Sequence, residues 1–480
     1  MTKPAVLIIG GLDPQGCAGI STDIKTVDHH GAHPIPLISC LTEQTQSGLT
    51  TMGSLTAEQF MGQYKSCVAD FDIAAIKIGL IPNVEIAQCI SVILDNHAVP
   101  VVMDPVLSAT SGGVKTNHAL HAIIRDELLS KITVLTPNLP ELNELAARVE
   151  KSSKAVKKLL ASGLNACLVT GGHTDSEWAT DFYIDSSCEF YCYQPKMGKQ
   201  VRGTGCSLAS SIAAHLAFGQ DIRDAIVLAK AYVHRGIRLS EAVGPYHVLH
   251  HNSVTLELID LPKLCYEPDL VGASFNFPSC PEKLGIYPVV DNEKWVERLC
   301  AEGVSTLQLR IKNTEQSERK RQIDKAVQHC QSYENIAFFV NDYWHDAIES
   351  KAYGVHLGQE DLHDANLIEI EKSGLRLGVS THSYWELARA LAINPSYIAL
   401  GPIFETTSKH MPFSPQGIER LQLWVELLTG HYPLVAIGGI DLARAQKLKT
   451  TGVGSVAMIS AITQADDYQL ATQALLNIWK

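Results

Sequence analysis

The sequence lacks any apolar run approaching the roughly 18 residues that a membrane-spanning helix needs. It is also short of positive charge, because 39 Lys and Arg residues are set against 51 Asp and Glu residues, leaving a formal charge of −12. The acidic excess is spread over both halves, so we expect no binding of nucleic acid or of a membrane surface. The first apolar run, at 6–9, is too short for a signal peptide. These absences predict a soluble, cytoplasmic protein.

Closely spaced cysteines are missing as well. The chain has 12 cysteines, but they are scattered, and only Cys188 and Cys192 lie near each other. No pair of C-x-x-C knuckles is present to build a zinc site, and the scatter does not indicate a disulfide framework. We therefore expect the cysteines to be reduced.

What is present is the composition and length of a multidomain globular protein. The 480 residues are 46% hydrophobic and 19% charged, which excludes a mainly disordered or fibrous chain. At roughly 100–200 residues per domain, this length predicts about two to four domains.

Residues 5–260 alternate short β-branched runs with helical patterns. Strands separated by helix-length segments indicate βαβ units, so we expect an α/β fold with a mostly parallel sheet and ligands at the carboxyl ends of its strands. An aromatic-rich pair of strands at 180–193 is typical of an antiparallel edge. The other expected strands are 5–10, 34–41, 74–80, 99–103, 132–136 and 166–170.

A second periodic region follows a break in the pattern. Four prolines between 262 and 282 predict a linker there, so the expected divisions are 1–261, 262–282 and 283–480. Eight β/α repeats in about 200 residues predict a small TIM barrel for the last of these. Its expected strands are 286–290, 306–310, 337–341, 354–358, 376–380, 397–401, 434–438 and 455–459.

Three motifs in the first region suggest chemistry. The glycine-rich segment 10–19 follows the first strand, but its spacing alone favours a tight turn over a ligand loop. Gly203-Thr204-Gly205-Cys206 opens an apolar helix, where N–H groups and the helix dipole could hold a phosphate or the charge that develops during phosphoryl transfer. At that position Cys206 would have a lowered pKa and could act as a base, although a buried structural cysteine is the commoner role for a single cysteine.

The third motif is 136–141, Thr-Pro-Asn-Leu-Pro-Glu. Asn138 and Glu141 could hold Mg²⁺ near phosphates, and a proline-set helix start with Glu141 in its first turn is an equally good interpretation.

Together these motifs resemble the hydroxymethylpyrimidine/phosphomethylpyrimidine kinases of the ribokinase-like superfamily, over roughly residues 5–260. The resemblance is carried by G-x-D-P-x-G-x-A-G-I-x-x-D-I-K-T (11–26), T-x-Q-T (42–45), K-I-G-L (77–80), D-P-V (104–106), T-P-N-L-P-E (136–141) and G-T-G-C (203–206). It implies an αβα sandwich that phosphorylates a hydroxymethylpyrimidine twice with ATP. Gly11, Asp23 and Gln44 would hold the pyrimidine, and Asp104, Asn138 and Glu141 would lie near Mg–ATP. Gly203, Gly205 and Cys206 would form the anion hole, with Cys206 as the base.

The sequence departs from that kinase family at three positions. Leu12 stands where Ser or Thr is usual, Cys17 where Gly is usual, and Arg202 where His is frequent. Two alternatives stay open. The first region could be a pyridoxal-type kinase of the same fold, or one of the two halves could be a catalytically inactive ligand sensor, for which Leu12 and Cys17 are the only hints.

In the second region every expected strand ends in polar or glycine residues. TIM-barrel sites lie at that face, so these residues should converge. Gln308, Arg310 and Lys312 share one side of their strand and supply an amide and two cations for a polyanion. Asp342 and Asp361, on neighbouring strand ends, suit one hard divalent ion. The glycines at 438–439 would cradle a phosphate, so the pattern predicts a metal-assisted site for two anionic substrates.

This set closely resembles the thiamine-phosphate synthases across about residues 284–462. The matches are Q-L-R-x-K (308–312), N-D (341–342), G-V-H-L-G-Q-E-D (354–361), G-V-S-T-H (378–382), G-P-I-F-x-T-x-S-K (401–409), A-I-G-G-I (436–440) and M-I-S-A-I (458–462). The resemblance implies Mg²⁺ at Asp342 and Asp361. It places the pyrimidine diphosphate at Gln308, Leu309, Arg310, Ile311, Lys312, Asn341, Ser380 and Lys409. It places the thiazole phosphate at Thr406, Thr407, Ser408, Gly439, Ile459 and Ser460.

The two resemblances together predict a bifunctional enzyme of thiamine biosynthesis. Its partners would be small molecules, namely the aminopyrimidine and its phosphates, the thiazole phosphate and ATP, with Mg²⁺ as cofactor. Homo-oligomerisation is compatible with the sequence. We interpret His356 as structural.

Overall fold

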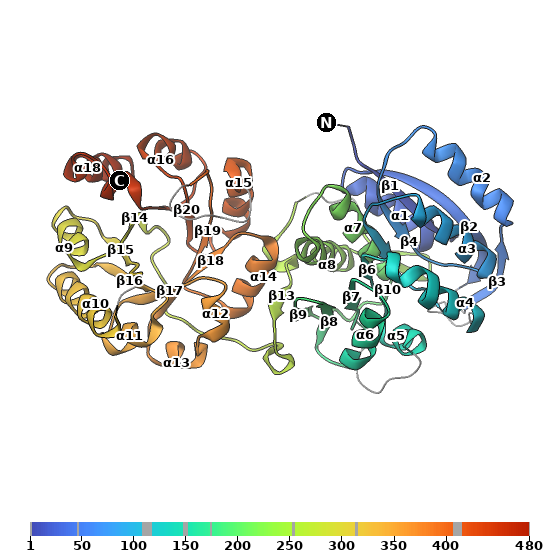
Figure 1. Cartoon of the computed structure of the whole chain (residues 1–480), viewed down its shortest axis with the longest axis horizontal. Coiled ribbons are helices and arrows are strands. Elements are labelled where there is room, and N and C mark those ends of the chain that lie inside the picture. Colours follow the sequence, from blue (N-terminus) through green and yellow to red (C-terminus); the bar gives the residue numbers. More distant parts are fainter. Residues whose placement is uncertain are drawn as a thin grey trace. The chain divides into compact units, whose positions relative to one another are not determined.

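The computed structural model describes residues 2–45, 48–107, 118–146, 152–172, 175–251, 255–312, 315–406 and 415–479. The chain divides into two compact units, Met1–Gly272 and Ala273–Lys480 (Figure 1). The division between them falls inside the segment that the prolines mark as a linker.

The first unit is built on a ten-stranded sheet, in the order β13-β9-β8-β7-β6-β5-β4-β1-β2-β3. The central strands, from β2 through β1 to β7, pair in parallel, and the pairs β2–β3, β7–β8, β8–β9 and β9–β13 are antiparallel. The expected mostly parallel sheet is therefore confirmed. The strands are β1 (Ala5–Leu12), β2 (His33–Thr45), β3 (Gly48–Ser54), β4 (Ile73–Ile78), β5 (Val101–Met103), β6 (Val134–Leu135), β7 (Ala166–Val169), β8 (Trp178–Asp185), β9 (Glu189–Pro195) and β13 (Lys263–Cys265).

The segment expected to be a linker is a linker only in part. Its first residues form β13, which pairs antiparallel with β9, so the 180–193 hairpin does not form the edge of the sheet. Prolines at 262 and 268 flank this short strand without interrupting it, and an edge strand tolerates them because one of its sides makes no ladder bonds.

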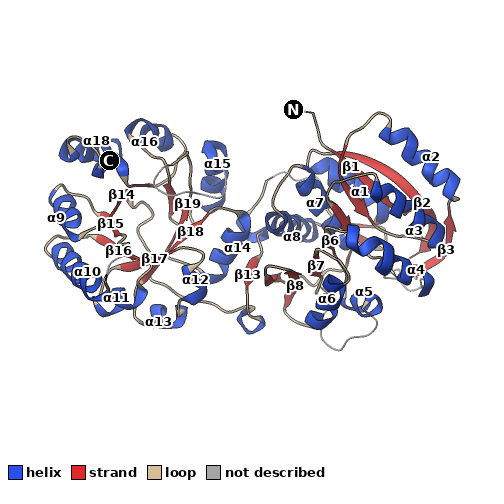
Figure 2. Ribbon diagram, in the orientation of Figure 1, coloured by secondary structure: helices blue, strands red, loops and turns tan. Residues whose placement is uncertain are grey.

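Helices cover both faces of the sheet (Figure 2). Leu7 and Ile9 of β1 belong to a core shared with α2 to α6, whereas the alternate residues Val6 and Ile8 are buried but lie outside that core. This alternation is the two-residue period of a strand buried on both faces. One layer is α2 (Ala57–Val68), α3 (Val84–Asp95), α4 (His118–Ile123), α5 (Leu139–Leu145) and α6 (Ser152–Ala161). The other is α1 (Gly19–His29), α7 (Thr204–Ala217) and α8 (Ile222–Arg238).

The second unit is a closed barrel of eight parallel strands, β14 to β21, ringed by helices (Figure 1). The TIM-barrel prediction is therefore confirmed. The strands are β14 (Gly285–Val290), β15 (Thr306–Leu309), β16 (Ala337–Asn341), β17 (Gly354–Leu357), β18 (Arg376–Thr381), β19 (Tyr397–Leu400), β20 (Leu434–Ile437) and β21 (Ser455–Met458). The helices are α9 (Glu293–Ala301), α10 (Gln316–Gln331), α11 (Trp344–Glu349), α12 (Asp361–Asp364), α13 (Leu367–Lys372), α14 (Tyr384–Ile393), α15 (Gly417–Leu428), α16 (Leu442–Lys449), α17 (Ser460–Thr463) and α18 (Tyr468–Trp479).

Histidines gather where α1 and α7 end, away from the Gly-rich segments that open both helices. The rings of His30 and His215 are 4.6 Å apart, and His30 Nε2 lies 2.8 Å from Ser211 Oγ. Tyr232 Oη lies 2.6 Å from His251 Nδ1. Burial lowers the pKa values of His215 and His251 to about 4. The cluster is therefore packed in its neutral form at neutral pH.

We expect the first unit to lose stability as the pH falls below about 6.5. A histidine with a native pKa of about 4 takes up its proton more readily in the unfolded chain, where its pKa is about 6.5. Its contribution is complete above the unfolded pKa and is lost progressively toward pH 4. Urea unfolding midpoints at neutral pH and near pH 5 measure this loss. His215→Gln should weaken the pH dependence and His118→Gln, at an exposed position, should not; equal slopes in both variants would contradict the assignment.

Candidate functional sites

Two glycine turns meet at the carboxyl edge of the first unit's sheet. Gly203 has a φ of 83°, and a Cβ on it would lie 2.5 Å from the carbonyl oxygen of Cys17. Gly19 has a φ of 57°, and a Cβ there would lie 2.3 Å from the carbonyl oxygen of Gly11. Only glycine permits both the left-handed conformation and these approaches. Gly203 is thus needed to bring its loop against the 10–19 segment, and Gly19 is needed to close that segment on itself.

The loop at 13–18 is held by its own aspartate. Asp13 Oδ1 accepts a hydrogen bond from the N–H of Gln15 at 3.0 Å, and Asp13 Oδ2 accepts from Cys17 and Ala18 at 3.1 and 3.0 Å. These N–H groups are engaged within the loop, which supports the tight-turn interpretation. Arg202 adds a side-chain bond to Gln15 at 3.2 Å and lies over the ring of Tyr246.

A buried ion pair lies next to these loops. Lys77 Nζ is 2.8 Å from Asp23 Oδ2, and Ser210 Oγ donates to Asp23 Oδ1 at 2.8 Å. Burial alone would lower the pKa of Lys77, but Asp23 and the neighbouring Cys206 and Asp104 outweigh it and raise that pKa. A Cβ at Gly79 would lie 2.9 Å from Lys77 Nζ, so this glycine leaves room for the ammonium group.

This pairing changes the role expected for Asp23. Both of its oxygens bond to side chains and the residue is fully buried, a geometry that favours support of Lys77 over the predicted direct contact with a pyrimidine. Lys77 is a site residue that the sequence reasoning missed. Its position inside the K-I-G-L motif was the available signal, but the motif did not reveal the partner 54 residues away.

Cys206 lies in the first turn of α7, but its thiol is not acidic. Burial raises the pKa of the Cys206 thiol to about 12, with Lys77 and a hydrogen bond from Gly19 N–H opposing that rise and Asp23 and Asp104 adding to it. The expected lowering of its pKa by the helix start is therefore wrong, because desolvation and two carboxylates outweigh the helix dipole. The thiol hydrogen-bonds to Asp104.

Asp104 and Glu141 lie near each other at the same edge. Burial, opposed by Lys77 and assisted by Asp23, raises the pKa of Asp104 to about 6. Burial and the charge of Asp104 raise the pKa of Glu141 to about 8. Two desolvated carboxylates that repel each other are a donor set that suits a divalent cation.

The motif at 136–141 is also a helix start. Asn138 Oδ1 accepts from the N–H of Glu141, and Glu141 Oε2 accepts from the N–H of Asn138, each at 2.9 Å. This is a complete capping box at the beginning of α5. The structural interpretation of this motif is thus borne out, and it places Glu141 beside Asp104 at the same time.

The remaining predicted kinase residues lie in β1, β2 and α7. Gly11 is the last residue but one of β1, and a Cβ on it would lie 3.0 Å from both Cys40 Sγ and Leu80 Cδ2. Gln44 lies in β2, where it pairs with Leu49 of β3. A Cβ on Gly205 would lie 3.7 Å from Asp104 Oδ2, so Gly203, Gly205 and Cys206 are all brought to this edge.

In the barrel, those predicted diphosphate residues that the structure describes lie at the carboxyl ends of β15, β16 and β18. Arg310 follows β15 directly, with its N–H donating to Val290 at 2.7 Å, and Lys312 is exposed. Leu309 and Ile311 have buried side chains, and Leu309 is paired with Val290 of β14 and Val340 of β16.

Neighbouring strand ends complete this face. Asn341 ends β16, and Asp342 follows it with a φ of 66°, a left-handed conformation that aspartate tolerates better than most residues. Asp361 opens α12, and its Oδ2 accepts from the N–H of Gly358 at 3.2 Å.

A hydrogen-bonded chain of side chains fills the barrel beneath this face. His356 Nδ1 lies 2.7 Å from Tyr397 Oη, and His356 Nε2 lies 2.8 Å from Ser380 Oγ. Tyr397 Oη is 2.8 Å from Tyr287 Oη, to which Gln308 Nε2 donates at 3.3 Å. This series of hydrogen bonds therefore connects Ser380 with Gln308, two of the residues predicted to bind the diphosphate. Burial, assisted by Arg310, lowers the pKa of His356 to about 4, so the imidazole is neutral.

A buried arginine orients the loop that carries Asp361. Arg389 donates to the backbone oxygen of Gln359 at 2.6 Å and to its Oε1 at 3.1 Å. The amide of Gln359 donates in turn to the backbone oxygen of Ser380 at 2.7 Å. The structural interpretation of His356 agrees with these contacts. Gln359 and Arg389 are supporting residues that the sequence reasoning missed, because their contacts across the barrel are not apparent in one dimension.

Glycines shape the predicted thiazole-phosphate end. Gly438 and Gly439 have φ values of 102° and 63°, and a Cβ on Gly439 would lie 2.3 Å from the carbonyl oxygen of Glu405. Arg444 donates to the carbonyl oxygen of Gly439 at 2.6 Å. Ile459 precedes α17, and Ser460 is the first residue of that helix. Thr406 is the last described residue before the range 407–414. Thr407, Ser408 and Lys409 lie outside the described residues.

In the ranges that the structure describes, no group of three or more His, Cys, Asp and Glu side chains is placed to hold a metal ion. Mg²⁺ usually takes only one or two carboxylates and completes its shell with water and substrate phosphate, so the pair Asp342 and Asp361 fits it in residue type. In the same part of the chain no helix has the length and apolarity to cross a bilayer.

Two family models match the chain, one on each unit. The model described as Phosphomethylpyrimidine kinase matches residues 13–251, and that described as Thiamine monophosphate synthase matches residues 286–462. Both models describe transferases. This is the class of enzyme that a kinase-like sandwich and a barrel with predicted phosphate-binding residues define. The resemblances deduced from the sequence are thereby confirmed for both units.

Curated relatives identify the barrel unit more closely. Thiamine-phosphate synthase of Escherichia coli O157:H7 (strain EC4115 / EHEC) is 54% identical over 213 residues, which are 44% of this chain and 97% of that protein. The thiamine-phosphate synthase of Shigella flexneri shows the same identity and coverage. The chain belongs to the thiamine-phosphate synthase family.

A solved structure supports the fold of the kinase-like unit. Pyridoxal kinase from Staphylococcus aureus in complex with AMP-PCP superposes with a TM-score of 0.50 at 22% identity, covering 55% of this chain and 99% of that one. This likeness concerns the fold alone.

Proposed function

We propose that the chain is a bifunctional enzyme of thiamine biosynthesis. The first unit phosphorylates 4-amino-5-hydroxymethyl-2-methylpyrimidine with ATP, first to the monophosphate and then to the diphosphate. The second unit couples the diphosphate with hydroxyethylthiazole phosphate and releases thiamine phosphate and pyrophosphate. The observation that carries this proposal is the pairing of both family matches in one chain, because the product of the first unit is a substrate of the second.

In the kinase, the start of α7 would receive the charge that develops on the transferred phosphoryl group. Gly203 and Gly205 let the backbone approach closely, and the first N–H groups of a helix have no partner within it. Asn138 and Glu141 would hold Mg–ATP with Asp104 beside them, and the ion would neutralise the phosphates. Lys77, fixed by Asp23, adds positive charge beside Cys206.

Cys206 would act by relay, since a thiol with a pKa of about 12 is protonated at neutral pH. As the hydroxymethyl oxygen attacks phosphorus, its proton passes to the Cys206 sulfur while the thiol proton passes to Asp104. The hydrogen bond between Cys206 and Asp104 supports this direction of transfer. The same arrangement would serve the second phosphorylation.

In the synthase, the bond between the pyrimidine methylene and the diphosphate would break before the new bond forms. The aminopyrimidine stabilises the methylene cation, and the thiazole nitrogen then adds to it. Arg310, Lys312 and Lys409 would stabilise the negative charge on the departing diphosphate, and Mg²⁺ held by Asp342 and Asp361 would neutralise it further. Gly439, Ile459 and Ser460, with Thr406, Thr407 and Ser408, would hold the phosphate of the thiazole.

One assay tests the complete proposal. The purified chain is supplied with the hydroxymethylpyrimidine, the thiazole phosphate, ATP and Mg²⁺, and thiamine phosphate is followed by chromatography. We expect its formation, with pyrimidine diphosphate accumulating when the thiazole is omitted. Phosphorylation of pyridoxal with none of the pyrimidine would replace the kinase assignment, and coupling without any kinase activity would indicate a ligand-sensing first unit.

We expect His356→Phe to impair binding of the pyrimidine diphosphate to the synthase. The change removes both hydrogen bonds that orient Ser380 and Tyr397. Two neutral hydrogen bonds are worth about 1–3 kcal/mol, so KM for the pyrimidine diphosphate should rise roughly tenfold or more while kinase activity stays unchanged. Steady-state kinetics with isolated pyrimidine diphosphate measure the effect.

Two variants separate positioning by His356 from general damage to the barrel. His356→Gln keeps a donor and an acceptor and should recover part of the loss. His363→Phe alters an exposed histidine of α12 and should leave KM unchanged. An unaltered KM in His356→Phe, or an equal rise in His363→Phe, would contradict the positioning role.

A further inference from the structure

Two cysteines of the barrel lie within contact distance behind a surface cavity. Cys300 Sγ, on α9, is 3.9 Å from Cys330 Sγ, on α10. Both side chains are buried on the faces by which the two helices pack, together with Leu299 and Val327. Rotation of the two side chains can shorten a sulfur–sulfur distance of this size toward the roughly 2.05 Å of a disulfide.

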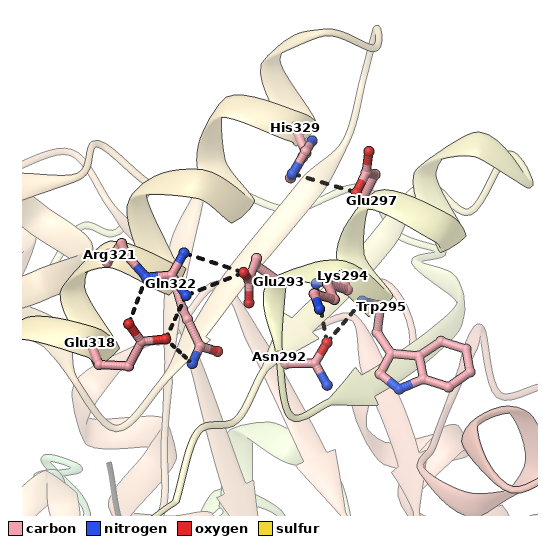
Figure 3. Close-up of polar contacts among 9 residues, drawn as sticks. All are labelled: Asn292, Glu293, Lys294, Trp295, Glu297, Glu318, Arg321, Gln322 and His329. Carbon is pink, nitrogen blue, oxygen red and sulfur yellow. Dashed lines mark hydrogen bonds and ion pairs between the residues drawn. The ribbon is translucent and has the colours of Figure 1, made fainter. Parts of the chain in front are cut away.

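Polar contacts hold the two helices in that alignment (Figure 3). Arg321 of α10 reaches Glu293 of α9 at 3.4 Å. At the other end of the pair, His329 lies 3.9 Å from Glu297. His329 precedes Cys330 in sequence, and Glu297 lies one helical turn before Cys300, so this contact lies where the two thiols meet.

A cavity gives access to one of the two thiols. It has a volume of about 460 Å³ and lies where β15, β16 and β17 begin, which is the end of the barrel opposite the synthase site. Cys330 lines the cavity and Cys300 does not, so a small molecule in the cavity would meet Cys330 first, with Cys300 behind it. Lys283 and Lys351 also line the cavity and are exposed. Their positive charges favour the entry of an anionic small molecule.

We propose that Cys300 and Cys330 form a thiol–disulfide exchange site that an anionic low-molecular-weight disulfide oxidises through this cavity. The Cys330 sulfur attacks one sulfur of the small disulfide; a mixed disulfide forms, the small S–S bond breaks and one small thiol leaves. Cys300 then attacks the Cys330 sulfur and expels the second small thiol. The protein pair loses two electrons and becomes a disulfide, the small disulfide gains them as two thiols, and the two cysteine protons pass to those thiols.

The pairing affects the two thiols in opposite ways. The hydrogen bond from the Cys330 thiol lowers the pKa of Cys300, although burial opposes this effect, and the same bond together with burial raises the pKa of Cys330. A thiolate is the attacking species in exchange, so a Cys300 of lowered pKa is suited to the resolving step.

Oxidised glutathione, which carries several carboxylates, is the probe for the test. The folded full chain is incubated with it, the remaining thiols are alkylated, and peptides are analysed by mass spectrometry without reduction. We expect a Cys300–Cys330 cross-linked peptide that dithiothreitol reverses, formed before modification of the fully buried Cys167. Circular dichroism of the same sample shows that the barrel has stayed folded.

Single substitutions test the order of the two steps. Cys300→Ser should stop the reaction at a mixed disulfide of glutathione with Cys330. Cys330→Ser should leave Cys300 unmodified, because Cys300 does not line the cavity. Lys351→Glu should slow cross-linking by oxidised glutathione several-fold and should not slow cross-linking by cystamine, a cationic disulfide. No cross-link in the folded chain, or equal glutathionylation of Cys300 in Cys330→Ser, would overturn the proposal.

Discussion

Asp361→Asn is expected to remove most of the coupling activity while pyrimidine phosphorylation remains at the unaltered rate. The substitution keeps the size of the side chain, and the amide oxygen can still accept the N–H of Gly358, which Asp361 Oδ2 accepts at 3.2 Å. It removes one of only two carboxylates proposed to hold Mg²⁺ against the diphosphate. Loss of a charge that stabilises the leaving group costs on the order of 100-fold in rate.

The magnesium dependence distinguishes a ligand from a structural residue. Initial rates of thiamine phosphate formation, with isolated pyrimidine diphosphate and thiazole phosphate, are measured over a range of Mg²⁺ concentrations. The half-saturating concentration should rise in Asp361→Asn, since a two-carboxylate site depends strongly on each ligand. A rate loss with an unchanged magnesium response would remove Asp361 from the metal site.

Glu360→Gln is the matched control for Asp361→Asn. It neutralises the adjacent, exposed carboxylate in the same loop. We expect less than about a twofold change in coupling rate, because an exposed charge is screened by solvent. An effect as large as that of Asp361→Asn would mean that the general charge of the loop, rather than one ligand, supports the reaction.

The strands and their polar ends were predictable because each depends on a pattern of residues that lie close together in the sequence. Each barrel strand lies within two residues of its expected bounds, as for β17, expected at 354–358 and observed at Gly354–Leu357. A buried parallel strand needs a continuous apolar run, and the chain must turn polar where it leaves the sheet. Local signals therefore located Arg310, Asp342 and Asp361 at one face.

The supporting side chains were not predictable for the opposite reason. Asp23 is bonded to Lys77, 54 residues away, and to Ser210, 187 residues away. His356 meets Tyr397 across the barrel, 41 residues away. Periodicity reports which face a residue occupies, but not which distant polar group shares that face. The strand β13 was missed similarly, since its three residues are stabilised by pairing with β9.

The pKa of Cys206 shows how a correct local argument can be outweighed. A helix start does favour a thiolate, by a fraction of a kcal/mol up to about 2 kcal/mol. Burial beside Asp23 and Asp104 acts in the opposite direction and raises the pKa to about 12. The sequence contains the helix start, whereas desolvation and the carboxylates exist only in the folded unit.

Cys206→Ala is expected to reduce pyrimidine phosphorylation by about 100-fold or more, the usual contribution of a positioned proton-transfer group. The variant removes the sulfur that would relay the hydroxymethyl proton to Asp104, with which the thiol is hydrogen-bonded. Coupling of supplied pyrimidine diphosphate should be unaffected, since that reaction takes place in the barrel. Both rates are measured on one preparation, the first by pyrimidine monophosphate and diphosphate formation and the second by thiamine phosphate formation.

Cys206→Ser decides between a relay and a resting thiolate base. A serine hydroxyl can accept one proton while donating another to Asp104, so a relay should survive in part, with kcat above that of Cys206→Ala. A base that had to be ionised before reaction would be lost equally in both variants, because serine does not ionise near neutral pH. Cys188→Ala removes a thiol at the turn between β8 and β9 and should leave the kinase rate unchanged. Phosphorylation at the full rate in Cys206→Ala would exclude Cys206 from proton transfer and leave Asp104 to accept the proton directly.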